Sequence, residues 1–215
     1  MKVRTATWAL APPLLWAFLA GLVAMTPSCA ASAGAPRPAE RAFMPIGGPT
    51  SVPYGWVDFC RRYHGECDGG LIVPRDINLT PQMMQVIDRV NKWVNAYVKP
   101  VSDPEQWGVI DQWDYPYDRR GDCEDYALFK RKILIEEGLP RQGLLMTVVK
   151  DEQDVGHAIL TVKTNSGEFV LDNLNDEVKP WNRTGYRFVK RQSQADQNLW
   201  VQIGDPTTTP DYVSH

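Results

Sequence analysis

The sequence has no surplus of cations, few histidines and few cysteines. Its 215 residues include 23 Lys and Arg against 26 Asp and Glu, which gives a formal net charge of -3. A chain of this kind lacks the broad basic surface that collects phosphates, so nucleic acid is not an expected partner. Only three histidines and four cysteines can serve as a base or a thiol nucleophile. There is no internal repeat, and the 43% of hydrophobic residues suffices for one globular domain.

An apolar run lies near the start of the sequence. Lys2 and Arg4 precede the run at 6–25, and the tripeptide at 31–33 fits the A-x-A pattern of an export-signal cleavage site. We therefore expect residues 1–33 to be a signal peptide and the mature protein to be periplasmic or secreted. An uncleaved membrane anchor is the alternative, because the run is about long enough to span a bilayer.

The cysteine count indicates one unpaired thiol. If Cys29 leaves with the signal, then Cys60, Cys67 and Cys123 remain, an odd number in an oxidising compartment. Cys60 and Cys67 can pair across a short loop, which leaves Cys123 without a partner. A zinc site built from Cys60, His64 and Cys67 is the competing interpretation, but it lacks a clear fourth ligand.

Two helices are predicted in the first part of the chain. Residues 34–51 are rich in Gly, Pro and Ala, which indicates an extended linker before a domain at 52–204, and we expect 205–215 to be a tail. Apolar residues at helical spacing predict a helix that Thr80 caps and that ends before Pro100. A second helix is predicted from Asp122 to Glu137, with Gly138 after its end. The segment between the helices is irregular and rich in acidic and aromatic residues, as functional loops often are.

The second part of the chain predicts a sheet. Short β-branched or alternating runs separated by turn residues lie at 144–150, 157–163, 168–172, 185–190 and 199–203. These runs are typical of an antiparallel sheet. Helices followed by a meander of strands predict an α+β fold, in which the helix that starts at Cys123 packs on the sheet.

Three residues fit the roles of nucleophile, base and orienting carboxylate. Cys123 lies at a predicted helix amino terminus, where unpaired N–H groups and the helix dipole stabilise a thiolate. His157 opens one strand and Asp172 ends the next. If these strands form a hairpin closed at Asn165 and Ser166, paired positions sum to about 331, so His157 and Asp172 are diagonal neighbours on one face. We therefore predict acyl-transfer chemistry with Cys123, His157 and Asp172.

Carboxylates are dense around the predicted nucleophile. Asp122, Glu124 and Asp125 flank Cys123, and the preceding loop carries Asp111, Asp114 and Asp118. Acidic residues in a first helical turn are common caps. Oxygen ligands at this density also suit calcium, which takes roughly six to eight of them.

Several motifs together resemble a known family. These are Gly121-Asp122-Cys123-Glu124-Asp125-Tyr126-Ala127, Lys130, Gly138-Leu139, Gly156-His157-Ala158-Ile159-Leu160 and Val170-Leu171-Asp172-Asn173-Leu174. Over about Val52 to Ile203 the chain is similar to the bacterial transglutaminase-like cysteine proteinases, which include the periplasmic LapG proteases. The resemblance implies a papain-like fold, a catalytic triad of Cys123, His157 and Asp172, and a calcium ion near Asp122, Glu124 and Asp125. For a LapG-type member it also implies a large surface adhesin of a biofilm as substrate and an inner-membrane cyclic di-GMP receptor as partner.

Two other functions remain open on the sequence. The same three residues could pass the acyl group to an amine, as a cross-linking transglutaminase does. A non-catalytic, calcium-stabilised binding module could instead present an aromatic loop with Trp107 and Trp113 as anchors.

Overall fold

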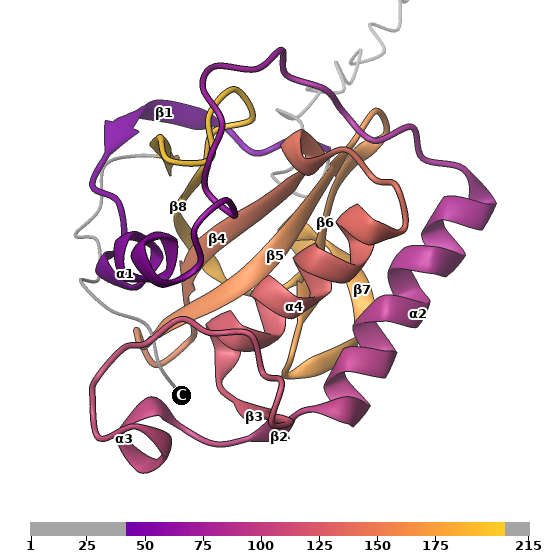
Figure 1. Cartoon of the computed structure of the whole chain (residues 1–215). Coiled ribbons are helices and arrows are strands. Elements are labelled where there is room, and N and C mark those ends of the chain that lie inside the picture. The colour runs from indigo at the N-terminus through magenta and orange to yellow at the C-terminus, as the bar shows by residue number, and fades with distance from the viewer. Residues whose placement is uncertain (1–41, 205–215) are drawn as a thin grey trace, which may run out of the picture. The chain divides into compact units, whose positions relative to one another are not determined.

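The computed structural model describes residues 42–204 (Figure 1). The expected signal peptide at 1–33 and tail at 205–215 lie outside the described residues. The helices are α1 (Tyr54–Arg62), α2 (Pro81–Tyr97), α3 (Asp103–Gln106) and α4 (Cys123–Glu136), with 3-10 turns η2 (Arg141–Gly143) and η3 (Trp181–Arg183). The strands are β1 (Ile46–Thr50), β2 (Lys99–Pro100), β3 (Arg120–Gly121), β4 (Leu144–Lys150), β5 (Gly156–Thr164), β6 (Gly167–Asp172), β7 (Asn175–Pro180), β8 (Arg187–Gln192) and β9 (Trp200–Ile203).

The main sheet is antiparallel throughout. Its order is β1-β9-β8-β4-β5-β6-β7, and a separate parallel pair joins β2 to β3. In the β5–β6 hairpin Leu160 pairs with Leu171 and Thr161 with Val170. Both pairs sum to 331, so the predicted register of this hairpin is confirmed. The sheet, the helix that starts at Cys123 and the α+β class are confirmed as well.

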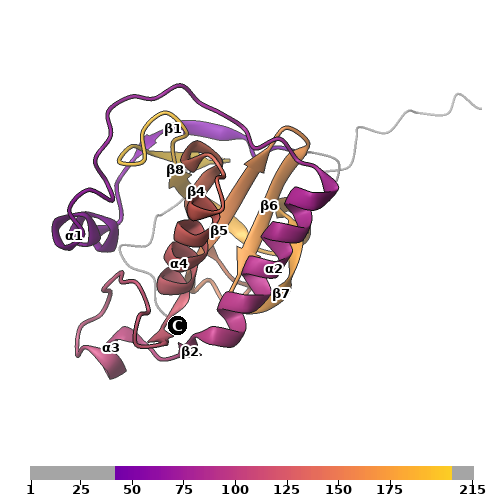
Figure 2. The same cartoon turned by 45° about the vertical axis from the view of Figure 1, so that its right-hand side comes forward.

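Helices α2 and α4 cover one face of the sheet (Figures 1 and 2). The Thr80 hydroxyl accepts a hydrogen bond from the Met83 N–H at 3.1 Å and caps α2, as predicted. Leu128 and Leu134 of α4 share one apolar core with Leu160 of β5. Alternate residues of the same strands, among them Ile159, belong to a second core cluster. The central strands are therefore buried on both faces, which holds their ends in fixed positions.

The described cysteines comprise one disulfide pair and one free thiol. Cys60 and Cys67 form a disulfide, as predicted, and Cys123 is the free cysteine of residues 42–204. The zinc alternative is wrong, because the disulfide occupies both of the thiols that it required.

Several elements differ from the sequence-based expectation, including the short α3, β2 and β3 in the segment expected to be irregular. Strand β1 pairs with β9, so Ile46–Thr50 of the expected linker belongs to the sheet. Its Gly47, Gly48 and Pro49 give no strand signal, and the free edge of β9 supplies the pairing instead. Helix α1 and strand β7 were not predicted either. Gly55 weakens the helix signal of α1. The packing at this position requires glycine, because a Cβ there would overlap the indole ring of Trp113.

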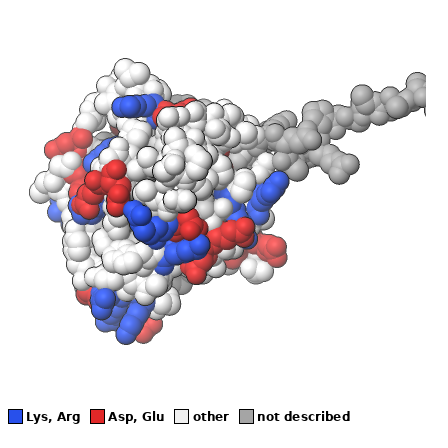
Figure 3. All heavy atoms as spheres, turned by 90° about the vertical axis from the view of Figure 1, so that its right-hand side faces the viewer, with Lys and Arg blue, Asp and Glu red and all other residues white. Residues whose placement is uncertain are grey.

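The surface near α2 mixes charges of both signs. Figure 3 shows acidic and basic side chains next to one another on this side of the molecule. Lys92 pairs with Asp88 at 2.8 Å along α2, and Arg89 reaches Glu137 of the loop after α4 at 3.5 Å. No helix within residues 42–204 combines the length and apolar character that crossing a bilayer requires.

Candidate active site

Cys123 is the first residue of helix α4. Its N-cap, Asp122, has an extended backbone, and the Asp122 carbonyl accepts the first helical hydrogen bond from the Tyr126 N–H at 3.2 Å. The sulfur is buried, and the Ala158 N–H of β5 donates to it at 3.4 Å. The helix terminus and this N–H both bring partial positive charge to the sulfur.

His157 and Asp172 form a buried pair. His157 lies at the start of β5 and Asp172 at the end of β6, and the imidazole Nε2 is 2.9 Å from Oδ1 of the carboxylate. Burial acts to lower the pKa of His157, but hydrogen bonds with Asp172 and Cys123 outweigh it and raise that pKa to about 9. The structure therefore brings all three predicted residues together, with an imidazole that favours its charged form.

Asp172 is held by groups that sequence reasoning missed. Its Oδ1 also accepts from the Leu174 N–H at 3.0 Å, and its Oδ2 accepts from the Tyr186 hydroxyl at 2.6 Å. Burial acts to raise the pKa of Asp172, but His157, Tyr186 and the Leu174 N–H stabilise the anion and lower it. The side-chain amide of Asn95 in α2 donates to the Asp172 carbonyl at 3.0 Å. Neither Tyr186 nor Asn95 belongs to a local motif, so the sequence carries no signal for these contacts.

A buried lysine lies behind the pair. Lys130 of α4 is fully buried, and its ammonium group has no hydrogen-bond partner within residues 42–204. Burial lowers its pKa to about 7 against the opposing charges of Asp172 and Asp176. Burial therefore opposes the charged form of Lys130, while its attraction to Asp172 and Asp176 favours that form.

The acidic residues form a compact cluster next to Cys123. Carboxylate oxygens of Asp103, Asp122 and Asp125 lie within 4.8 Å of one another, and so do those of Asp103, Asp111 and Glu124. The three predicted ligands are thus gathered in space, and Asp103 links the two groups. Sequence reasoning missed Asp103, whose Asp-Pro pair opens the short helix α3 and gives only a helix-start signal.

Burial makes this cluster costly without a cation. Burial, and next the Asp122 charge, raises the pKa of Asp103 to about 7, while burial raises the pKa of Asp122 to about 6. Burial and neighbouring acids raise the pKa values of Glu124 and Asp125 well above their usual range. Asp122 Oδ1 and Glu124 Oε1 are buried without a hydrogen-bond partner in the described chain. Unpaired carboxylate oxygens at this density fit a hard divalent cation such as calcium.

Two acids of the preceding loop have other partners. Asp114 binds Arg62 at 2.7 Å and also accepts from the Tyr63 hydroxyl, so helix α1 holds it. Asp118 accepts from Gln106 at 3.1 Å. The Asp114 N–H in turn donates to Asp125 at 2.6 Å, so this loop positions one carboxylate of the cluster.

The aromatic residues of the loop divide between surface and core. Trp107 is 47% exposed, whereas Trp113 is fully buried against Trp56 and Trp200. Trp113 therefore cannot serve as the anchor that the alternative binding-module hypothesis required, because its ring is part of the core.

Comparison with known proteins assigns the chain to a family. The model of the bacterial transglutaminase-like cysteine proteinases matches residues 46–208, most of the sequence. No curated protein matches the sequence. Among solved structures, calcium-bound LapG of Legionella pneumophila is 24% identical, with a TM-score of 0.49 over 62% of this chain and 77% of that one. EGTA-treated LapG of the same organism is also 24% identical, with a TM-score of 0.48 over 60% and 74%. On the family match, the chain belongs to the bacterial transglutaminase-like cysteine proteinases and is a cysteine peptidase.

Proposed function

We propose that the chain hydrolyses a peptide bond of a protein substrate with Cys123 as nucleophile, His157 as base and Asp172 as the residue that orients the imidazole. The observation that carries this proposal is the 2.9 Å His157–Asp172 pair beside the sulfur at the start of α4. A thiol with a base, and a carboxylate behind the base, is the arrangement that acyl transfer requires.

The reaction has two steps. The thiolate of Cys123 attacks the carbonyl carbon, and His157 donates its proton to the leaving amine nitrogen as the C–N bond breaks. Water then attacks the acyl-enzyme while His157 accepts a proton, and cleavage of the C–S bond releases the carboxylic acid and regenerates the thiolate. The Cys123 N–H at the helix start supplies one donor for the oxyanion that forms in each step.

The acidic cluster holds calcium in this proposal. Asp122, Glu124 and Asp125 are the ligands that the sequence indicates, and Asp103 and Asp111 lie close enough to join them. A bound cation supplies positive charge, which offsets the repulsion among buried carboxylates. The Cys123 thiol donates to Glu124 at 3.1 Å, so the state of this carboxylate affects the thiol directly.

Location, substrate and partner follow from the sequence resemblance. We propose a periplasmic or secreted enzyme, and the Cys60–Cys67 disulfide supports an oxidising compartment. The proposed substrate is a large surface adhesin, and the proposed regulator is an inner-membrane cyclic di-GMP receptor.

Incubation with a candidate adhesin fragment tests the function. The wild-type protein should cut the fragment, cutting should fall when a calcium chelator is added, and Cys123→Ala should not cut. Mass spectrometry distinguishes the products, because hydrolysis leaves a free carboxylate and acyl transfer to an amine leaves an amide. Cutting by Cys123→Ala would refute the mechanism, and an amide product alone would favour the transglutaminase.

A further inference from the structure

A cavity lies away from the Cys123 thiol. Its volume is about 280 Å³, and its walls come from the loop after the disulfide, helix α4, the turn η2 and the segment after β8. Arg131, one of the lining residues, follows Cys123 by eight positions on α4, a rise of about 12 Å. The cavity is therefore separate from the proposed catalytic residues.

Arg131 brings a buried charge to this cavity. The residue is 2% exposed, its Nε donates to the Leu144 carbonyl at 3.1 Å, and its Nη2 donates to the Gln197 side chain at 2.8 Å. No carboxylate within residues 42–204 forms an ion pair with it, and its Nη1 makes no hydrogen bond there. Buried guanidinium groups normally have an anionic partner.

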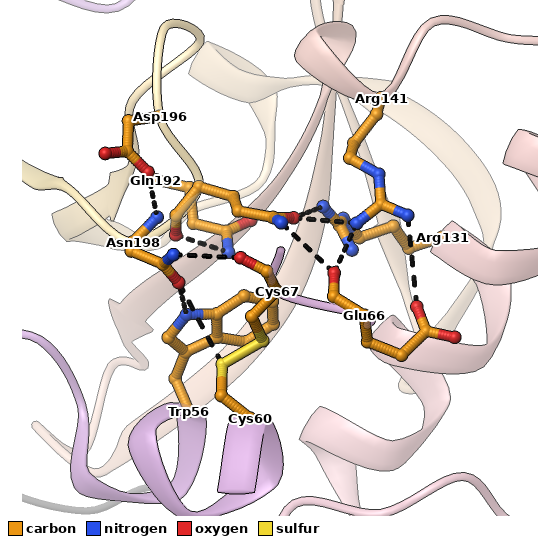
Figure 4. The surroundings of a disulfide bond; sticks show 10 residues. Trp56, Cys60, Glu66, Cys67, Arg131, Arg141, Gln192, Asp196 and Asn198 are labelled. Atoms are coloured by element: carbon orange, nitrogen blue, oxygen red, sulfur yellow. Dashed lines mark hydrogen bonds and ion pairs between the residues drawn. A yellow bond between two sulfur atoms is a disulfide. The ribbon is translucent and has the colours of Figure 1, made fainter. Parts of the chain in front are cut away.

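A second guanidinium converges on the same point. Arg141 lies beside Arg131 (Figure 4). Its Nη1 donates to the Gln197 side-chain oxygen at 2.9 Å, so one amide oxygen accepts from both arginines. The Arg141 Nη2 lies 3.9 Å from the Glu66 carboxylate, a long ion pair that Glu66 also shares with Lys132. Burial, and next the charge of Arg141, lowers the pKa of Arg131 to about 10. Arg131 therefore has no ion pair with a carboxylate within residues 42–204, and Arg141 has only the long contact with Glu66.

We propose that this cavity binds a carboxylate group between Arg131 and Arg141. Guanidinium groups hold carboxylates through two parallel N–H bonds, and Nη1 of Arg131 makes no hydrogen bond within residues 42–204. The volume admits a small dicarboxylate or one acidic side chain of a peptide. The two sources share the same chemistry, and binding experiments distinguish them.

One acidic residue of the cavity opposes the ligand. Asp68 lines the cavity and is exposed. The adjoining Gly69 and Gly70 lack side chains, which leaves the mouth open near the backbone. Repulsion from Asp68 should weaken carboxylate binding, so its removal gives a test in the opposite direction from removal of an arginine.

Titration calorimetry on the Cys123→Ala variant tests the proposal. Chloride keeps the ionic strength constant. The probes are succinate and its neutral isostere succinamide, followed by the blocked tripeptides Ala-Glu-Ala and Ala-Gln-Ala. Succinate should bind saturably, and succinamide should not. Binding of the Glu tripeptide but not the Gln tripeptide would extend the site to protein side chains.

Variants in the same background decide whether the arginines carry the binding. Arg141→Gln should raise the dissociation constant for succinate at least about tenfold, and Asp68→Asn should lower it. Arg89→Gln, on exposed α2, is the matched control and should change nothing. Arg141 is used because loss of the buried Arg131 could unfold the protein. No saturable binding of any carboxylate probe, or binding that is indifferent to Arg141→Gln, would overturn the proposal.

Discussion

The hydroxyl of Tyr186 lies 2.6 Å from Oδ2 of Asp172, the carboxylate oxygen that does not face His157. The other oxygen, Oδ1, binds both His157 and the Leu174 N–H. The carboxylate is thus held at both oxygens and cannot rotate away from the imidazole without breaking a hydrogen bond. Tyr186 is therefore a positioning residue for the proposed base.

Tyr186→Phe should lower kcat/KM by about 10- to 100-fold and leave KM nearly unchanged. The ring remains, but the carboxylate loses a charge-assisted hydrogen bond of about 1.5–3 kcal/mol. The pKa of Asp172 should rise, so the acid limb of the pH–rate profile should move to higher pH. Exposed Tyr54→Phe is the matched control. A variant with an unchanged pH profile would show that Tyr186 only fills space.

His157→Ala should slow labelling of Cys123 by a thiol-reactive epoxide by about 100-fold or more, because the imidazole assists ionisation of the thiol. The rate is measured by mass spectrometry of the labelled peptide. Exposed His64→Ala serves as the control and should label like wild type. Equal rates for all three proteins would remove His157 from the mechanism.

The His157–Asp172 pair should make the protein less stable as pH rises into the alkaline range. The pKa of His157 is about 9 in the folded state against an ordinary value of 6.5, so folding takes up a proton between these values. The resulting stabilisation is full below pH 6.5 and is lost as pH rises through about 9. Urea unfolding from pH 6 to 9.5 should show this loss in the wild type and a smaller loss in His157→Gln. Parallel curves for the two proteins would contradict the raised pKa.

Calcium should stabilise the protein more at high pH than at low pH, because the acidic cluster is then more fully ionised. Without a cation, the raised pKa values of Asp103 and Asp122 make the fold less stable as pH increases from about 4 toward 7. The chelated protein should therefore have a higher Tm at pH 5.5 than at pH 8, and calcium should raise Tm more at pH 8. Thermal scans with calcium or EGTA measure this, and an equal calcium effect at both pH values would argue against these ligands.

Gly55→Ala should reduce the free energy of unfolding by about 1–3 kcal/mol, because the added methyl group overlaps Trp113 in a packed core. Gly48→Ala is the matched control, since its Cβ would meet no atom within 4 Å. Urea denaturation compares the two variants. If both variants had wild-type stability, α1 would have to shift at little cost in free energy. Its contacts with the 111–114 loop would then contribute little to stability.

The parts of the fold that local patterns encode could be predicted. The β5–β6 register follows from one turn at Asn165 and Ser166 together with period-two alternation. Helix α4 is bounded by local signals, Asp122 at its start and Gly138 beyond its end. These signals also sufficed to place a thiol at a helix start and a His and an Asp on neighbouring strands.

The parts that depend on tertiary contacts could not be predicted. Strand β1 forms because β9 offers a free edge to pair with. The sequence Ile-Gly-Gly-Pro-Thr does not itself indicate a strand. Asp103 precedes Asp122 by nineteen positions and joins it only through the fold, and its N–H bonds the Asp122 carboxylate at 3.2 Å. Tyr186 reaches Asp172 from the segment before β8. Residues far apart in sequence complete both the acidic cluster and the histidine pair.

His157 and Asp172 lie on a single hairpin, whereas Cys123 lies on helix α4, which precedes that hairpin in the sequence. The base and its carboxylate can meet through a short loop, but the sulfur gains its base only when helix and hairpin dock. A newly synthesised chain that has not completed this docking holds a thiol and an imidazole that cannot cooperate. In the proposed mechanism, proteolytic activity therefore requires that helix α4 has docked on the hairpin.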